Sequence, residues 1–275
     1  MELDILRAIQ SIHTPFLDAF FEGITMLGEE IFIVPLLAVI FWTIDKKFGE
    51  ALAFTIFTSL LLNNSLKELF YMERPIGQEG IRTLRPETAT GKSFPSGHSQ
   101  NAGATAGALS IGMKKRLVTI IAMTLMTLIG LSRLYLGVHY PKDAIVGIIL
   151  GLLVAFTVSK LINKVEPMKL YLIVLTLFLP VLFFANSADF IKALASYIGF
   201  VLGIYMEKKV VNFSTDGTLL RKVLRVLLGI VIILLIKEGL EKVFLDTLFF
   251  DFIRYFLITF VAIGVYPWLF KKIRL

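Results

Sequence analysis

The sequence predicts an all-α protein, a polytopic bundle of helices embedded in a membrane. Hydrophobic residues make up 56% of the 275 residues and charged residues 18%, which is more apolar side chain than the core of a soluble fold of this size could bury. The apolar residues occur in long runs, separated by short links that are polar or contain Gly and Pro. Basic residues gather in those links and give a net charge of +7, a pattern typical of membrane topology and not of nucleic-acid binding.

Nine apolar runs are candidates for transmembrane helices, because a bilayer core needs about 20 apolar residues per helix. In chain order they are 30–45, 49–71, 98–112, 117–136, 141–163, 168–186, 190–206, 221–238 and 250–270. In residues 1–29, acidic side chains interrupt the apolar ones, which favours a helix lying in the membrane interface. No link could separate soluble domains, so we predict one membrane domain over 1–275, with an interfacial segment at 1–29, a core at 30–163 and an extension at 164–275.

Five basic clusters set the expected orientation. With nine helices, all five fall on one side of the membrane, which the positive-inside rule makes the cytoplasmic side. The clusters are Lys46 and Lys47; Lys114, Lys115 and Arg116; Lys160, Lys164 and Lys169; Lys208, Lys209, Arg221 and Lys222; and Lys271, Lys272 and Arg274. The loop 72–97 and the turn 136–141 then face the non-cytoplasmic side, in a protein that we expect in the cell membrane.

Three polar signatures occur in or beside the apolar helices, where ionisable groups are costly and usually functional. They are Lys67 followed by Arg74-Pro75, then Pro95-Ser96-Gly97-His98, and finally Ser132-Arg133 followed by His139 and Asp143. In the expected topology, each signature lies at the non-cytoplasmic end of its helix. We therefore expect the three signatures to converge on one site.

The cations and small residues of these signatures suit phosphoryl transfer, whose transition state spreads charge over three equatorial oxygens. Lys67, Arg74 and Arg133 supply positive charge, and the two arginines present planar forks that match phosphate oxygens. Ser96 and the backbone amide of Gly97 stand where a helix is expected to begin, and free amides at a helix N-terminus favour an anion.

Two histidines can divide the remaining chemistry. One must attack phosphorus as a neutral imidazole, and the other must protonate the departing oxygen. Asp143 follows His139 by four residues and can accept the second ring proton of that histidine. Taken alone, either histidine would more often be structural, but the three signatures in order on one face make His98 and His139 candidates for catalysis.

The three signatures resemble, without a substitution, those of the type 2 phosphatidic acid phosphatase superfamily, over roughly residues 49–163. The resemblance implies that His139 is the nucleophile, that Asp143 is its partner, and that His98 is the acid for the leaving group. The phosphate cradle that it implies consists of Lys67, Arg74, Ser96, Gly97 and Arg133. It also implies that the enzyme needs no metal or other cofactor and that the site opens on the non-cytoplasmic face.

The expected substrate is a lipid phosphate or diphosphate, such as polyprenyl diphosphate or phosphatidic acid, because the site lies at a membrane surface. Membrane lipids are the expected partners, and nucleic acid is not. Three alternative functions stay open: hydrolysis of a small soluble substrate such as a sugar phosphate, transfer of phosphate to another acceptor, and lipid transport without catalysis on the same scaffold. A homo-oligomer is a possible assembly.

Several other polar residues carry weaker signals. Arg82 and Arg85 lie in the loop 72–97, where a solvated loop of mixed charge is expected and contact with a second phosphate or a headgroup is the alternative. Asn63 precedes the first signature on an apolar helix and is expected to bind a neighbouring helix.

Small residues and one arginine of the later helices also carry expectations. The spacing of four glycines predicts close helix packing; they are Gly103, Gly107, Gly147 and Gly151. In the extension, Arg225 is followed at once by a long apolar run, and Glu207 or Asp216 is its expected ion-pair partner.

Overall fold

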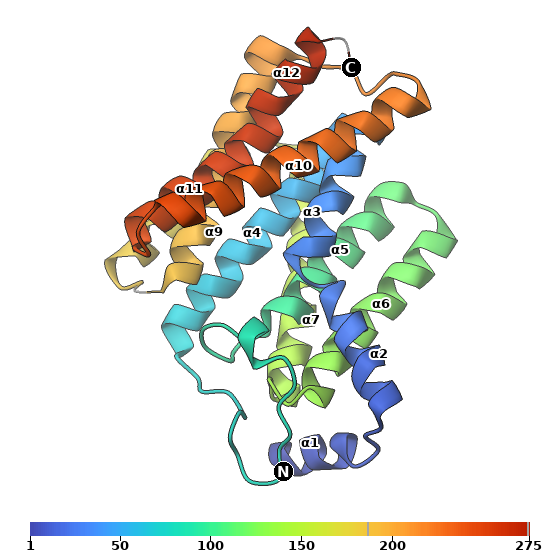
Figure 1. The fold of residues 1–275 in the computed structure, drawn as a ribbon, viewed down its shortest axis with the longest axis vertical. Coiled ribbons are helices and arrows are strands. Elements are labelled where there is room, and N and C mark those ends of the chain that lie inside the picture. Colours follow the sequence, from blue (N-terminus) through green and yellow to red (C-terminus); the bar gives the residue numbers. More distant parts are fainter. Residues whose placement is uncertain (186, 274) are drawn as a thin grey trace. The chain divides into compact units, whose positions relative to one another are not determined.

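The structure, a computed structural model, describes residues 1–185, 187–273 and 275 (Figure 1). Arg274, a member of the C-terminal basic cluster, lies outside the described residues. Every regular element among the described residues is a helix or a helical turn, so the predicted all-α class is confirmed. The chain forms two compact units: unit 1 comprises 1–33 and 62–160, and unit 2 comprises 34–61 and 161–275.

The elements follow one another along the chain with short connections, apart from the loop between α4 and α5. They are α1 (Glu2–Gln10), α2 (Pro15–Met26), α3 (Glu30–Val39), η1 (Ile40–Ile44), α4 (Lys46–Phe70), η2 (Pro86–Thr88), α5 (Gly97–Met113), α6 (Arg116–Tyr135), α7 (Pro141–Leu161), α8 (Pro167–Phe178), η3 (Leu179–Phe183), α9 (Ala188–Met206), η4 (Glu207–Val211), α10 (Leu219–Val243), α11 (Leu248–Phe260), η5 (Val261–Val265) and α12 (Tyr266–Lys272).

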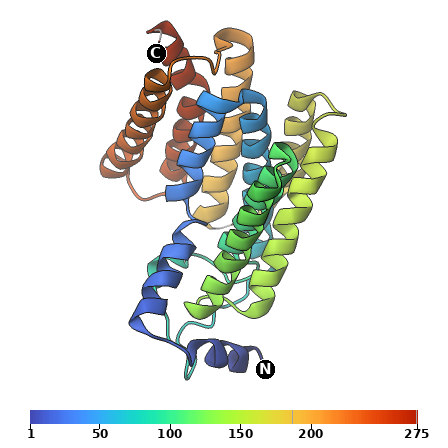
Figure 2. The ribbon, with the colours of Figure 1, turned by 90° about the vertical axis from the view of Figure 1, so that its right-hand side faces the viewer.

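In unit 1, α5, α6 and α7 lie side by side (Figures 1 and 2). Glycines allow α5 and α7 to approach closely. A Cβ atom at Gly151 would lie 2.2 Å from the carbonyl oxygen of Gln100, and one at Gly103 would lie 2.6 Å from that of Ile148. The prediction that these glycines serve helix packing is therefore confirmed.

The N-terminal segment belongs to the same compact unit as the three signatures. Gln10, at the end of α1, donates from Nε2 to the carbonyl oxygens of Arg82 at 2.7 Å and Tyr135 at 2.8 Å. These bonds join α1 to the loop after α4 and to the last turn of α6. Residues 1–29 thus contact the part of unit 1 that carries the signatures.

Among the described residues, four helical segments are long and apolar enough to cross a membrane: α6, α7, α9 with η4, and α11 through α12. A fifth is added if α2 and the segment Glu30–Ile44 count as one broken span. The nine predicted spans are therefore not confirmed. The 17 residues of α5 and the 12 of α8 fall short of the ~20 that a span needs. In α4, Asn63 and Asn64 interrupt the apolar run, and charged residues occupy both ends of α4 and of α10.

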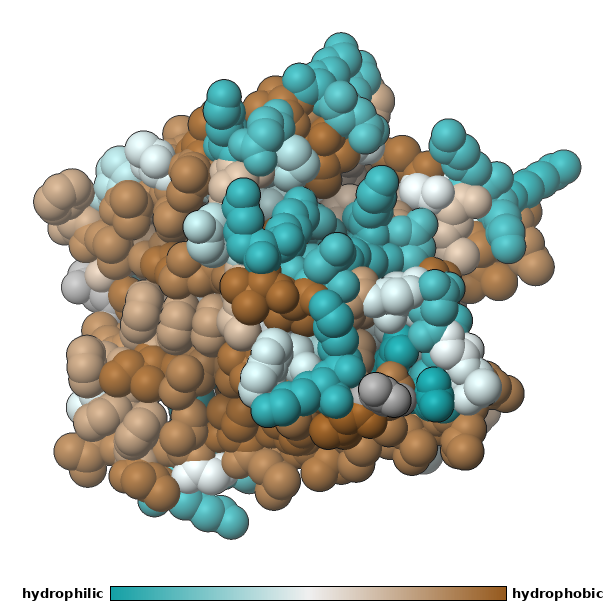
Figure 3. All heavy atoms as spheres, turned by 90° about the horizontal axis from the view of Figure 1, so that it is seen from above, coloured by the Kyte–Doolittle hydropathy of each residue, from teal (hydrophilic) through white to brown (hydrophobic). Residues whose placement is uncertain are grey.

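Both units expose many large hydrophobic side chains, as a surface in contact with lipid requires. In unit 1 they line α6 and α7, at Leu117, Ile120, Ile121, Ile145, Ile149 and Leu153. In unit 2 they line α10, at Leu227, Leu228, Val231, Leu234 and Leu235. Figure 3 shows one face of the molecule, on which hydrophobic side chains cover most of the left and lower parts and hydrophilic side chains gather in the middle and toward the top and upper right.

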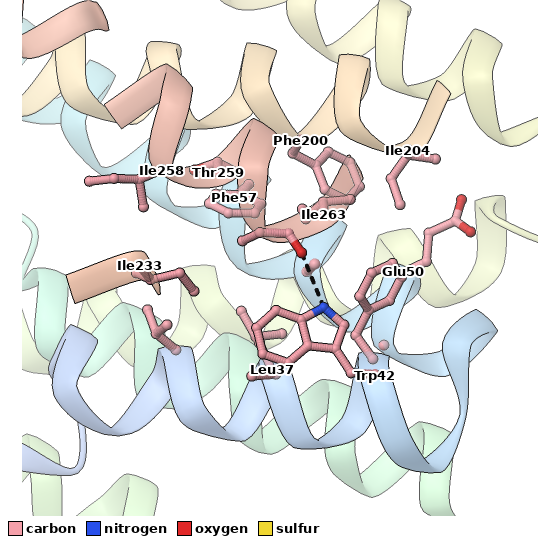
Figure 4. A pocket seen from close by; sticks show the side chains of 16 residues that line it. Leu37, Trp42, Glu50, Phe57, Phe200, Ile204, Ile233, Ile258, Thr259 and Ile263 are labelled. Carbon is pink, nitrogen blue, oxygen red and sulfur yellow. Dashed lines mark hydrogen bonds between the residues drawn. The ribbon is translucent and has the colours of Figure 1, made fainter. Parts of the chain in front are cut away.

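Unit 2 contains an apolar cavity of about 90 Å³ (Figure 4). Trp42 borders the cavity and donates from Nε1 to the carbonyl oxygen of Ala262 at 3.1 Å. Of the described residues that line the cavity, only Glu50 is charged, and its Oε1 accepts hydrogen bonds from Tyr171 at 2.5 Å and Lys208 at 2.6 Å. Because the cavity offers no cation, it lacks what a phosphate group requires.

Arg225 binds Asp216, one of its two expected partners, but through the backbone oxygen of Asp216 and not through an ion pair. Arg225 donates from Nη1 to the carbonyl oxygen of Ser214 at 3.0 Å and from Nη2 to that of Asp216 at 2.8 Å. Glu207 instead accepts from Lys46 Nζ at 2.9 Å. A guanidinium has five donors in a fixed fork, and the carbonyl oxygens of the turn before α10 satisfy two of them without burying a second charge.

Candidate active site

His139 lies in the tight turn that joins α6 to α7 in unit 1. Gly137 shapes this turn with a φ of +69°, a region that glycine adopts without strain. A Cβ atom at Gly137 would lie 2.1 Å from the carbonyl oxygen of Arg82. Pro141 then begins α7, as the sequence predicts. The result is a histidine side chain that is only 1% exposed.

Asp143, in the first turn of α7, is buried next to His139. Its Oδ2 accepts hydrogen bonds from the backbone N of Tyr140 at 2.9 Å and from Oγ of Ser93 at 2.5 Å. The same oxygen lies 3.4 Å from Nδ1 of His139. A carboxylate at Nδ1 keeps the ring proton on that nitrogen and leaves the lone pair on Nε2. The structure thus brings together the pair that four-residue spacing suggested.

Arg74 lies against the other ring nitrogen of His139. Its Nη1 donates to Nε2 of His139 at 2.9 Å and to the carbonyl oxygen of Val138 at 2.9 Å. Its Nη2 donates to the carbonyl oxygen of Thr90 at 2.6 Å. Burial, followed by the positive charges of Arg74 and Arg133, holds the pKa of His139 well below its ordinary 6.5. The imidazole is therefore neutral near pH 7, as a nucleophile must be.

The second signature forms the start of α5. Ser96 is the N-cap residue, and its Oγ accepts from the hydroxyl of Ser99 at 2.9 Å. The backbone N of Ser96 donates to the carbonyl oxygen of Asp143 at 3.0 Å and so joins the second signature to the third. A Cβ atom at Gly97 would lie 3.9 Å from Nζ of Lys67. The ammonium of the first signature therefore lies beside a helix N-terminus that favours an anion.

Arg133 lies in the last turn of α6, with a side chain that is 1% exposed. Its Nη1 donates to Oγ1 of Thr25 at 2.8 Å. Its Nε and Nη2 have no hydrogen-bond partner among the residues that the structure describes. Buried donors without an acceptor are costly. Two of them on one guanidinium form a fork that two phosphate oxygens would complete.

His98, in the first turn of α5, faces a carboxylate that the sequence did not connect with it. Its Nε2 lies 3.4 Å from Oε1 of Glu29. Arg85 donates two hydrogen bonds to the same carboxylate, from Nη1 to Oε1 at 2.9 Å and from Nη2 to Oε2 at 3.3 Å. Glu29 appeared in the sequence as one of several acidic residues in an interfacial segment. Its place directly before an apolar run was the only signal of a special role.

The two loop arginines contact the N-terminal segment. Arg82 pairs with Asp18 at 2.7 Å, and Arg85 pairs with Glu29. The oxygens that they bind therefore come from the protein's own carboxylates. Contact of Arg82 or Arg85 with a headgroup stays a prediction.

Two further buried polar side chains support the signatures. Asn63 donates from Nδ2 to the carbonyl oxygen of Pro95 at 3.2 Å and to Oε1 of Gln100 at 2.9 Å, and so links α4 to α5 as predicted. Ser93, which binds Asp143, was missed because a single serine ahead of the second signature carries no sequence signal.

Three side chains bring positive charge to the site. Within the part of the chain that the structure describes, no three His, Asp or Glu side chains group closely enough to hold a metal ion. The cations of the three signatures, Lys67, Arg74 and Arg133, lie near His139 and contribute to its electrostatic environment. The arrangement can bind a phosphate group, present a neutral imidazole to it and stabilise the charge that develops.

Known proteins are similar to this chain over the range that contains the three signatures. A family model described as the PAP2 superfamily matches residues 49–167, and one described as "PAP2 superfamily phosphatase, transmembrane extension" matches residues 191–275. The chain is 34% identical over 175 residues to phosphatidylglycerophosphatase B of Bacillus subtilis, an alignment that covers 59% of this chain and 83% of that protein. It is 30% identical over 165 residues to lipid A 4'-phosphatase of Bacteroides thetaiotaomicron, which covers 55% of this chain and 72% of that protein.

A solved structure agrees with these relatives. The crystal structure of LpxE from Aquifex aeolicus superposes with a TM-score of 0.53 at 33% identity, over 58% of this chain and 94% of that one. The relatives are lipid phosphatases by name, and the identities are well above the level at which only a fold is shared. The chain therefore belongs to the PAP2 superfamily and is a membrane-embedded phosphatase.

Proposed function

We propose that the chain hydrolyses a lipid phosphate or diphosphate through a phosphohistidine on His139, without a metal. The observation that carries this proposal is the pair of buried, unpartnered donors on Arg133. The charge of Arg133 acts on both His139 and His98. A phosphate held by this fork would therefore be within the electrostatic reach of a neutral nucleophile and of a candidate acid.

The proposed reaction has two displacement steps. In the first, the lone pair on Nε2 of His139 attacks phosphorus, the bond from phosphorus to the leaving oxygen breaks, and His98 gives that oxygen a proton. In the second, His98 takes a proton from water, the water oxygen attacks phosphorus, and the P–N bond breaks to release orthophosphate. Asp143 holds the proton on Nδ1 of His139 in both steps and stabilises the charge on the ring.

The relatives support a lipid substrate. They include phosphatidylglycerophosphatase B, lipid A 4'-phosphatase and undecaprenyl-diphosphatase BcrC, the last from Bacillus subtilis at 26% identity. The substrates in these names are different lipids, but each carries a phosphate group on a membrane anchor. The apolar surface of this chain would bring the site to such substrates.

Purified protein in detergent with EDTA can test the proposal against phosphatidic acid, a polyprenyl diphosphate and a sugar phosphate. We expect orthophosphate release from a lipid and an acid-labile, base-stable phosphoenzyme, both absent in His139→Ala. Wild-type turnover by His139→Ala would overturn the mechanism. Turnover of the sugar phosphate alone would overturn the lipid assignment, and lipid movement without phosphate release would indicate a transporter.

We also propose that the site opens on the non-cytoplasmic face of the cell membrane, as the basic clusters suggest. The native chain has no cysteine, so single exposed positions can be labelled with a membrane-impermeant thiol reagent. Gln78→Cys, in the loop after α4, should label in intact cells. Lys114→Cys, between α5 and α6, should label only after lysis. The reverse pattern would place the chemistry in the cytoplasm.

A further inference from the structure

Each of the two histidines in the site has a carboxylate of its own. Asp143 lies one helical turn after His139 along the chain, whereas Glu29 precedes His98 by 69 residues. Both contacts measure 3.4 Å between a ring nitrogen and a carboxylate oxygen. The three signatures predict the pair of His139 and Asp143. They do not predict the pair of His98 and Glu29, because Glu29 lies outside them.

The Glu29 carboxylate is fixed in place. Arg85 binds both of its oxygens, and the side chains of Arg85, Glu29 and His98 are 20%, 18% and 16% exposed. A two-point bond between a guanidinium and a carboxylate restricts rotation more than a single contact does. Gly28 adds to this order, because a Cβ atom there would lie 3.5 Å from Cβ of His98. The chain just before α3 therefore packs directly on the histidine.

The contact decides which nitrogen of His98 can exchange a proton. Glu29 accepts from Nε2, so the carboxylate keeps a proton on that atom. Nδ1 has no hydrogen-bond partner among the described residues and is the nitrogen left for the substrate. Burial is the main influence against the protonated form of His98. The charges of Arg133 of α6 and Lys67 of α4 also oppose that form, and Glu29 favours it. Arg85 acts on His98 through Glu29.

We infer that Glu29 is a positioning residue for His98, which sets Nδ1 as the proton donor to the leaving group and stabilises the imidazolium form. This inference rests on the proposed function. During the first step, the Nδ1–H bond breaks and its proton goes to the departing oxygen, while Nε2 keeps its proton toward Glu29. During the second step, Nδ1 takes a proton from water. Glu29 stays ionised throughout, and Arg85 holds its carboxylate in a fixed orientation toward His98.

Leaving-group dependence provides the test. A poor alkoxide leaving group, as in phosphatidic acid, needs a proton from the acid, whereas the 4-nitrophenolate of 4-nitrophenyl phosphate hardly does. The quantity to compare is kcat/KM, which reports the first step. Active sites are counted by trapping the phosphoenzyme from the aryl substrate, so that misfolded protein does not enter the rate.

For Glu29→Gln, kcat/KM should fall about 10²-fold with phosphatidic acid and stay within about threefold with the aryl substrate. The glutamine retains a hydrogen-bond acceptor but not the charge. The alkaline limb of the pH profile should therefore move to lower pH by about one unit, because the imidazolium loses an opposite charge. Glu29→Asp keeps the charge and should restore most of both effects. The matched control is Glu30→Gln, which removes the neighbouring exposed carboxylate and should match wild type.

Two sets of results would overturn the inference and leave the proposed function intact. In the first, His98→Ala shows the leaving-group dependence and Glu29→Gln shows none. In the second, Glu29→Gln loses activity equally with both substrates at an unchanged pH profile. If an unpaired Arg85 prevents folding of Glu29→Gln, the double variant Glu29→Gln/Arg85→Gln carries the same expectations. A phosphoenzyme that forms in His139→Ala would instead overturn the proposed function.

Discussion

Replacement of Arg133 by methionine should separate activity from stability. Arg133 is 1% exposed, and Nε and Nη2 have no acceptor among the described residues. Charge-assisted hydrogen bonds contribute about 1.5–3 kcal/mol each, so the loss of two from the transition state should cost about 3–6 kcal/mol. That cost corresponds to a fall in kcat/KM of about 10²- to 10⁴-fold.

Stability should respond in the opposite sense. A buried cation without a close carboxylate costs the folded protein several kcal/mol, on the order of 2–5, and methionine removes that cost while it fills similar space. Against this gain stands the lost hydrogen bond to Thr25, worth about 1 kcal/mol. The midpoint of thermal unfolding without ligand should therefore stay the same or rise.

Thermal unfolding with and without orthophosphate measures both effects. In wild type, phosphate at 100 times its Kd should stabilise the folded state by about 2.7 kcal/mol, and in Arg133→Met this gain should disappear. Arg116→Met, at the exposed start of the same helix, is the matched control and should keep the gain. An Arg133→Met protein that unfolds at a much lower temperature and is still stabilised by phosphate would refute the reasoning.

Three further predictions concern pH, packing and metals. Because the pKa of His139 is held well below 6.5 and the neutral ring is the attacking form, the acid limb of kcat/KM should lie below pH 6.5; a limb at or above 6.5 would contradict the proposed nucleophile. Gly151→Ala should lower the thermal midpoint, since its Cβ would lie 2.2 Å from a carbonyl oxygen of α5, whereas Gly239→Ala, with open space around its Cβ, should not; equal midpoints would show that the α5–α7 packing can relax. EDTA should leave kcat unchanged, because arginine and lysine side chains supply the positive charge, and metal-reversible inhibition by EDTA would argue against that source of charge.

Patterns of neighbouring residues in the sequence predicted several contacts of the candidate site. His139 and Asp143 are four residues apart and flank Pro141, so a turn followed by a helix start brings them together whatever the rest of the fold does. Likewise, Ser96 before Gly97 predicts the cap of α5. The helical class followed from composition. Inside lipid every backbone N–H and C=O group needs a hydrogen-bond partner within the protein, and for long continuous apolar runs the helix provides it.

Contacts across long sequence separations could not be predicted. Glu29 reaches His98, and Asp18 reaches Arg82, only through the packing of the N-terminal helices against α6 and the loop after α4. No periodicity encodes such pairings, so the acidic residues of 1–29 looked like an interfacial face. The nine predicted spans are not confirmed, for a related reason. Apolar content locates helices, but α8, which has 12 residues, shows that an apolar helix can be too short to cross a membrane.

The hydrogen bond from Arg74 to His139 implies a nucleophile that is masked at rest. While Nη1 of Arg74 donates to Nε2 of His139, the lone pair that would attack phosphorus is occupied. A neutral electrophile has no oxygen that accepts from the guanidinium more strongly than Nε2 does. A phosphate dianion does, because its charged oxygens compete for the same donor more strongly than imidazole can. Substrate binding and exposure of the nucleophile would then be a single exchange of acceptors, which protects the histidine from reagents that carry no negative charge.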